Sequence, residues 1–135
     1  MRLKFPVFLL AAMLCAAACE DTATTTPTST APPITDPPYT GTIGKNNGTT
    51  FQFTSTARGS VQATVTTLDP DSAVIGVAIG VWNGTSCQLV QVKDDAIQGS
   101  TVATTASGVG NLCLRVYDSG KVTDPVTYSV TLVHP

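Results

Sequence analysis

Charged side chains and histidine are scarce in this chain of 135 residues. Asp, Glu, Lys and Arg make up 12% of the sequence, with seven basic residues, nine acidic residues and one histidine, His134. The basic residues do not cluster as phosphate binding requires, so we expect no nucleic-acid partner. A Ser-His-Asp site needs a histidine base, and His134 stands one residue from the end of the sequence, where we expect it to be mobile. We therefore predict a protein that is not an enzyme.

Paired carboxylates are also few. Asp69 and Asp71 flank a proline, and Asp94 with Asp95 stand shortly before a glycine, so turn formation explains both pairs better than acid-base chemistry. A calcium site built from Asp94 and Asp95 with Asp118 or Asp124 is the alternative, and we expect that no calcium binds there. The sequence thus predicts neither a bound metal nor a cofactor.

Only one long apolar run is present, at residues 5–14, and it is too short to span a bilayer. It follows two basic residues and precedes small ones, which is the order of a secretory signal peptide. Cys19 comes directly after three alanines and resembles the lipidated cysteine of a bacterial lipobox, although Ala16 stands where leucine is usual. An ordinary signal peptide is the alternative. We expect residues 1–18 to be removed and acyl chains on Cys19 to anchor the protein to a membrane of the cell envelope.

Two further regions follow the signal peptide. Residues 19–38 are rich in Thr, Ala, Ser and Pro and carry too little apolar surface to fold, which predicts a disordered tether. Residues 39–135 are enough for one domain and too few for two.

The domain has the sequence pattern of β-structure. Its apolar residues recur with a period of two in short runs bounded by Gly, Asn, Asp and Pro, and no helical period occurs. Eight strands are predicted, at residues 39–43, 49–55, 61–68, 73–82, 87–93, 101–106, 112–118 and 126–133. This pattern predicts an all-β, antiparallel β-sandwich of the jelly-roll type.

Two cysteines remain in the domain, Cys87 and Cys113, and strand alternation places both on outer faces. A turn at residues 83–86 sets Cys87 opposite Trp82, while the core face is expected to carry Ile79, Val81, Val90 and Val92. In an exported chain, a disulfide between Cys87 and Cys113 on adjacent strands is the default interpretation. A two-cysteine metal site is the weaker alternative, because zinc normally takes three or four ligands.

Four segments resemble, in order, the strands of bacterial pre-peptidase C-terminal domains. They are Phe-x-Phe in residues 49–55, Gly-x-Val in 59–65, Gly followed by a hydrophobic residue, Arg, Val and Tyr in 110–117, and Tyr-x-Val-x-Leu-Val in 128–133. The resemblance covers most of residues 40–134. It implies a β-sandwich accessory domain of secreted proteins, which in some relatives binds calcium or extracellular polymers. Residues 73–80 lack the alternating acidic residues and leucines of many relatives, so calcium binding is not carried over.

Two classes of function are consistent with these observations. The first is a binding or adhesion module for an extracellular polysaccharide or an envelope protein, with Trp82, Leu89 and Tyr117 around the disulfide as its candidate surface. Alternatively, Trp82 only covers the sheet. The second class is a structural or assembly lipoprotein that contacts another envelope protein, and an accessory domain of a secreted hydrolase is a third possibility. Exposed aromatic side chains lying together would favour the first class.

Overall fold

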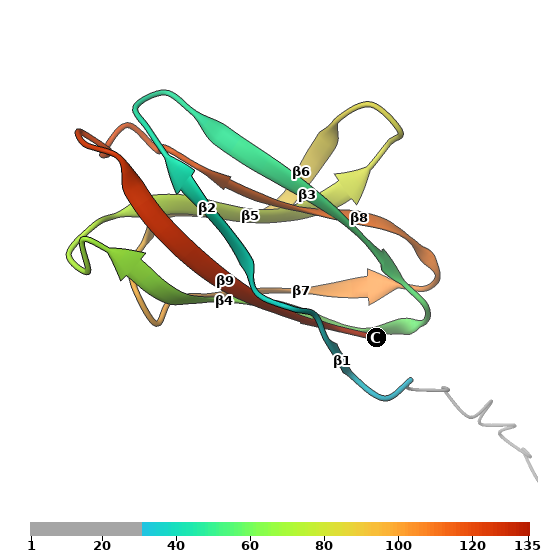
Figure 1. Ribbon diagram of the computed structural model, residues 1–135. Helices are drawn as coiled ribbons and strands as arrows, with labels where there is room; N and C mark the ends of the chain where they lie inside the picture. The colour runs from blue at the N-terminus through green and yellow to red at the C-terminus, as the bar shows by residue number, and fades with distance from the viewer. Residues whose placement is uncertain (1–30) are drawn as a thin grey trace, which may run out of the picture.

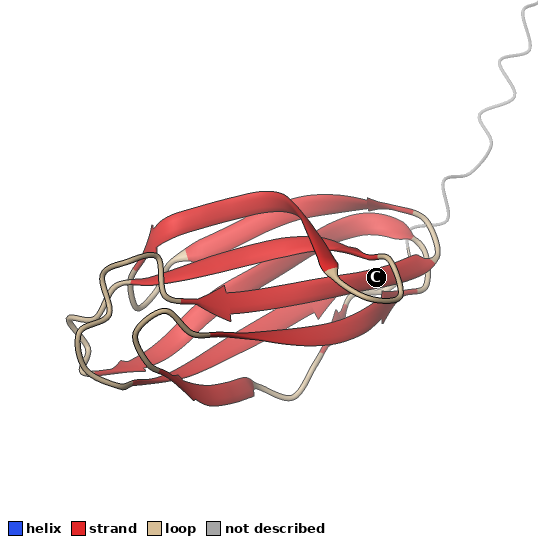
Figure 2. Ribbon diagram, turned by 90° about the horizontal axis from the view of Figure 1, so that it is seen from above, coloured by secondary structure: helices blue, strands red, loops and turns tan. Residues whose placement is uncertain are grey.

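The computed structural model describes residues 31–135, which form two antiparallel β-sheets packed face to face (Figure 1). Figure 2 shows the two layers from above, with every element in this part of the chain a strand or a loop. The strands are β1 (Ile34–Thr35), β2 (Tyr39–Ile43), β3 (Gly48–Ser55), β4 (Arg58–Asp69), β5 (Ile75–Trp82), β6 (Cys87–Ala96), β7 (Thr101–Ser107), β8 (Gly110–Tyr117) and β9 (Val126–His134). The predicted all-β sandwich is confirmed.

The strand order is that of a jelly roll. One sheet runs β2-β9-β4-β7, with β1 on the same side of β9 as β2, and the other runs β3-β8-β5-β6. From β2 onward, strands that follow one another in sequence alternate between the sheets, except at the β5–β6 hairpin. Each sheet therefore has two outer strands, and the sandwich has two open sides: β2 faces β3 on one, and β6 faces β7 on the other.

The core lies between the sheets and consists of the inward side chains of alternating positions. Along β9 the buried residues are Val126, Tyr128, Val130, Leu132 and His134. On β4 the buried row Val61, Ala63 and Val65 continues at Leu68, because a β-bulge after Val65 changes which residues face inward. Burying a Val, Leu or Ile side chain fully contributes about 1.5–3 kcal/mol relative to leaving it exposed, so the core as a whole stabilises the sandwich.

Strand β5 is buried on both faces. It pairs with β8 on one side and β6 on the other, and residues 75–80 are all buried. Ile75, Val77 and Ile79 face the core. Before Trp82, the other face carries only Gly76, Ala78 and Gly80, and these small residues leave room for groups from the neighbouring strands.

The prediction that Val81, Val90 and Val92 face the core was wrong. Their exposed fractions are 44%, 61% and 40%. Val81 is near the end of β5 and lines an open slot between the sheets, while for Val90 and Val92 the reason lies in β6, an outer strand whose register against β5 shifts between Ile79 and Gly80. Val90 is the extra residue of this bulge, and beyond it Val92 pairs with Ala78 on the outer face.

The sandwich begins earlier than predicted. Ile34–Thr35 forms β1 and pairs with Val133 and His134 of β9, so residues 34–38 belong to the domain and not to a tether. The predicted signal peptide, residues 1–18, and Cys19 lie outside the described residues. From residue 31 onward, the structure has no helix with the length and hydropathy needed to cross a membrane.

Candidate functional site

Cys87 and Cys113 are bonded to each other in the structure, as the sequence predicted, with Cα atoms 5.8 Å apart. The expected arrangement on adjacent strands was wrong. Cys87 lies on β6 and Cys113 on β8, and β5 runs between these two strands. Cys87 pairs with Trp82 of β5, and Cys113 pairs with Gly80. The disulfide therefore crosses over the outer face of β5.

The crossing is possible because β6 folds over β5 at Gly80. The backbone of Gln88 and Leu89 lies so close to Gly80 that a Cβ atom there would overlap the Gln88 carbonyl group. Glycine is thus required for steric reasons at this position. Cys113 is fully buried beneath this fold, whereas Cys87 is partly exposed.

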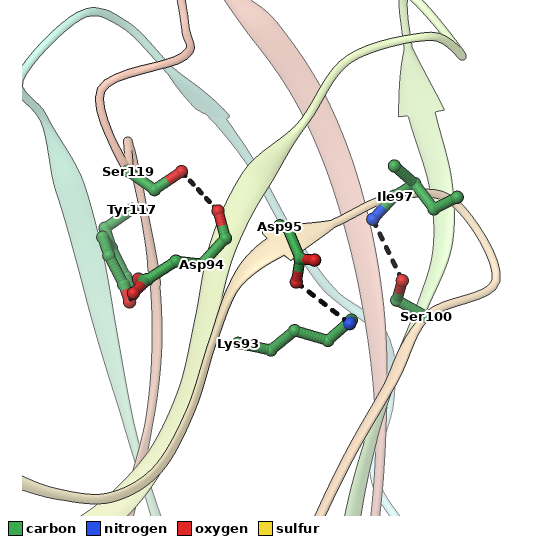
Figure 3. Close-up of polar contacts among 7 residues, drawn as sticks. All are labelled: Lys93, Asp94, Asp95, Ile97, Ser100, Tyr117 and Ser119. Carbon is green, nitrogen blue, oxygen red and sulfur yellow. Dashed lines mark hydrogen bonds and ion pairs between the residues drawn. The ribbon is translucent and has the colours of Figure 1, made fainter.

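A second link joins β8 to β6 at the other end of β5. The Tyr117 hydroxyl donates a hydrogen bond to the Asp94 carboxylate, and the Ser119 hydroxyl donates to the Asp94 carbonyl oxygen at 2.6 Å (Figure 3). The Tyr117 ring covers Gly76 so closely that a side chain at Gly76 would overlap it. Burial, and then the bond to Asp94, raise the pKa of Tyr117 to about 12, so the hydroxyl stays a donor at physiological pH.

The predicted surface of Trp82, Leu89 and Tyr117 is not one patch. Tyr117 pairs with Gly76, whereas Trp82 lies six residues further along β5, roughly 20 Å away at about 3.3 Å per residue. Trp82 is only partly exposed. Leu89 is near Trp82, because it follows Cys87 by two residues on β6. Tyr117 is therefore a link between strands, and no pair of adjacent exposed aromatics forms here.

Uncovered apolar side chains are concentrated on the β5–β6 hairpin. Among residues 31–135, seven large apolar side chains are exposed, and four of them lie on this hairpin: Val81, Leu89, Val90 and Val92. Between β6 and β7 is a slot of about 120 Å³, whose walls include Ile79, Val81, Val90, Ala106 and Leu112. We call these four exposed residues and the slot the valine edge. It has room for a small apolar group.

The opposite side of the sandwich, between β2 and β3, is lined by aromatic rings, which form part of an open groove of about 580 Å³. Tyr39 packs against Phe51 with ring centroids 4.9 Å apart, and Phe53 packs against His134 at 5.1 Å. The expectation of a mobile His134 was wrong, because the residue lies in β9 and is buried. The valine edge has no such aromatic cover among the described residues.

His134 also has a carboxylate partner that sequence reasoning missed. Its Nε2 atom lies 3.3 Å from Oδ1 of Asp36, whose Oδ2 accepts a hydrogen bond from the Tyr39 hydroxyl at 2.6 Å. The nearby hydroxyls of Thr54 and Ser55 donate elsewhere, to Asn111 and to the Ala57 carbonyl. A His-Asp pair is therefore present without a hydroxyl nucleophile bonded to it in this part of the chain.

The acidic residues considered for calcium are engaged with other groups. Asp118 accepts backbone N–H bonds from Asn46 on one oxygen and from residues 120, 121 and 122 on the other, at 2.7 to 2.9 Å. These bonds, that from Asn46 most strongly, hold the pKa of Asp118 below its usual range. Asp95 pairs with Lys93 at 3.0 Å. Within residues 31–135, no three His, Cys, Asp or Glu side chains are grouped so that they could hold a metal ion.

The sequence carried little signal for the valine edge or the Asp36–His134 pair. Alternating valines predict a core strand, and a lone aspartate among prolines predicts a linker. The resemblance to pre-peptidase C-terminal domains stays a prediction. No family model, curated protein or solved structure matches this chain.

Proposed function

We propose that this protein is a non-enzymatic lipoprotein of the cell envelope, anchored through Cys19, whose sandwich binds a partner protein at the valine edge. The observation that carries the proposal is the concentration of exposed aliphatic side chains on an outer strand. Apolar clusters of this kind on soluble domains mark interaction surfaces. The localisation rests on the signal-peptide and lipobox pattern of residues 1–19.

The backbone of β6 adds support, because an outer strand presents unpaired N–H and C=O groups. Natural proteins protect such strands with charged side chains, prolines or β-bulges. Residues 88–92 carry no charged side chain and no proline, and the bulge at Val90 interrupts the strand at one position. The charges that follow are engaged within the domain, Lys93 with Asp95 and Asp94 with Tyr117. An extended segment of a partner protein could therefore add to this sheet by backbone hydrogen bonding.

Polysaccharide binding is the alternative, and it is less well supported. Sugar rings stack on exposed aromatic side chains, and Trp82 and Tyr117 lie at opposite ends of β5. The valine edge is aliphatic, which favours a protein partner.

Photo-crosslinking in the cell that produces the protein tests this proposal. A photoreactive residue at position 90 should give a discrete protein adduct, and Leu89→Glu in the same chain should remove it, because a carboxylate cannot be buried in an apolar contact. Position 109 is the matched control, since Val109 is 80% exposed but lies between β7 and β8, away from the hairpin.

Three outcomes would contradict the proposal: no adduct at position 90, the same adducts at both positions, or an adduct unaffected by Leu89→Glu. Retention of the purified protein on envelope polysaccharide, undiminished by Leu89→Glu, would favour the alternative.

A further inference from the structure

The tripeptide Asn-Gly-Thr occurs twice in the domain, at residues 47–49 and 83–85. Asparagine followed by glycine is especially prone to spontaneous deamidation, because glycine has no side chain that would hinder attack of its own backbone nitrogen on the asparagine amide. Both asparagines are exposed, one just before β3 and the other between β5 and β6. Sequence and exposure therefore give the two sites the same expected reactivity.

The side chain of Asn83 is fixed by three hydrogen bonds. Its Oδ1 atom accepts from the backbone N–H groups of Thr85 at 2.9 Å and Ser86 at 2.8 Å. Its Nδ2 atom donates to the Ser86 hydroxyl at 3.2 Å. Both ends of the side-chain amide are thus bound to residues beyond Gly84, and attack by the Gly84 nitrogen would have to break these bonds.

The side chain of Asn47 lies against the nitrogen that would attack it. The Gly48 N–H donates to Oδ1 of Asn47 at 2.7 Å, and within residues 31–135 the Asn47 side chain has no other hydrogen bond. The Asp118 N–H donates to the Asn47 carbonyl at 2.8 Å, so Gly48 and Tyr117 face each other as a pair that exchanges no backbone hydrogen bonds. The Gly48 nitrogen is therefore not held by the neighbouring strand.

The pairing of β3 with β8 also requires glycine at position 48. A Cβ atom there would lie 2.8 Å from the Cβ atom of Tyr117, which is closer than two such atoms can approach. The packing of the sandwich therefore keeps a reactive Asn-Gly pair at the start of β3.

We propose that Asn47 is a site of spontaneous deamidation and that the fold protects Asn83. The Gly48 nitrogen forms a bond to Cγ of Asn47, and Nδ2 leaves as ammonia together with the proton of the Gly48 N–H. Water then adds to the cyclic imide and breaks one of the two C–N bonds of its ring. Aspartate or isoaspartate is left at position 47. The first step is favoured because the nitrogen and the amide are already close together.

The reaction would place a new carboxylate opposite Asp118. Positions 47 and 118 come directly after the Gly48–Tyr117 pair in the register of β3 and β8. Backbone N–H bonds, the bond from Asn46 first, hold the pKa of Asp118 below its usual range, so Asp118 is ionised. Like charges opposite each other on paired strands are destabilising. Deamidation should therefore loosen the contact between the β2–β3 turn and the loop after β8.

Mass spectrometry on the purified full chain, kept folded at neutral pH, tests the proposal. Trypsin places the two asparagines in separate peptides, and fragment ions distinguish Asn47 from Asn46. Asn47 should deamidate about tenfold faster than Asn83, because the Asn83 side chain must first give up its hydrogen bonds. The same chain, reduced and unfolded in guanidinium, is the control. Both sites should then react at similar rates, because the two tripeptides are identical.

Equal rates in the folded chain would overturn the proposal, and so would faster reaction at Asn83 or a folded chain that is stable at both sites while the unfolded chain reacts. Asn47→Asp tests the expected loosening. The Asn46 and Asp118 amides should exchange hydrogen about threefold faster than in the unaltered chain, because of the opposed carboxylates. Asn83→Asp adds the same charge elsewhere and should leave these amides unchanged. Unchanged exchange in Asn47→Asp would refute the loosening.

Discussion

At the scale of single residues, the small side chains of β5 have the largest consequences. Gly80 lies under the backbone of β6, and Gly76 lies under the Tyr117 ring. Both positions allow groups from the neighbouring strands β6 and β8 to lie over β5. The local sequence shows only that small residues lie in a strand. The steric requirement for glycine depends on which groups of the neighbouring strands lie over these positions, and the local sequence does not identify those groups.

Gly80→Ala should destabilise the domain, because the added methyl group would overlap the fixed backbone at Gln88. We expect a loss of about 1–3 kcal/mol in the free energy of unfolding, the usual cost of overpacking, measured by urea denaturation. Gly110→Ala is the control, since nothing lies within 4 Å of a Cβ atom there. Equal stability of Gly80→Ala and the unaltered chain would show that β6 does not lie over β5 as described.

At the scale of elements, β6 departs furthest from a regular strand in its pairing and its links to the rest of the sheet. It is an outer strand, it contains a bulge at Val90, and it is linked to β8 across β5 by the disulfide and by Tyr117 with Asp94. These links hold the strand in the curled position that presents the valine edge. Without them, β6 would keep only its backbone pairing with β5.

Removal of the disulfide with Cys87→Ala and Cys113→Ala tests this view of β6. The bond closes a loop with a sequence separation of 26, for which loop entropy predicts about 3 kcal/mol of stability, so we expect a loss of about 2–5 kcal/mol. Hydrogen exchange should increase most in residues 87–92, where β6 lies over β5.

The bond itself is checked by mass spectrometry under non-reducing conditions, which should recover a joined Cys87 and Cys113 peptide pair. Free thiols in the exported protein, or a uniform rise in exchange over all strands, would contradict a local role in holding β6.

At the scale of the whole molecule, the two open sides of the sandwich differ in chemistry. Aromatic rings and residues 34–38 line the side between β2 and β3, whereas the side between β6 and β7 leaves valines exposed. This asymmetry places the proposed partner contact at β6 and β7, on the side of the sandwich away from residues 34–38.

Cys19→Ser should release the protein from the membrane fraction, because the acyl chains proposed to anchor it need the cysteine thiol. Cell fractionation with immunoblotting measures this distribution. Cys15→Ser is a matched control, since Cys15 lies within the predicted signal peptide and its loss should not alter anchoring. Full retention of Cys19→Ser in the membrane fraction would refute the lipid anchor.

The sequence by itself determined the fold class and the pairing of the cysteines. Strand alternation is a local property of the sequence, and its period of two predicted strands with one buried face. The alternating burial of β9, and of β4 up to its bulge, confirms this prediction. The disulfide followed from the presence of only two cysteines in a domain that is predicted to be exported.

Tertiary structure alone decided which apolar residues are covered. Val81, near the end of β5, and Val90, on the outer strand β6, have the pattern of core residues but are exposed, while His134, near the end of the sequence, is buried by contacts with Asp36 and Phe53. Burial depends on which strands become neighbours, and that depends on pairings between residues far apart in the chain. Alternation within a strand does not contain this information, because it describes the two faces of a strand and not what lies opposite each face.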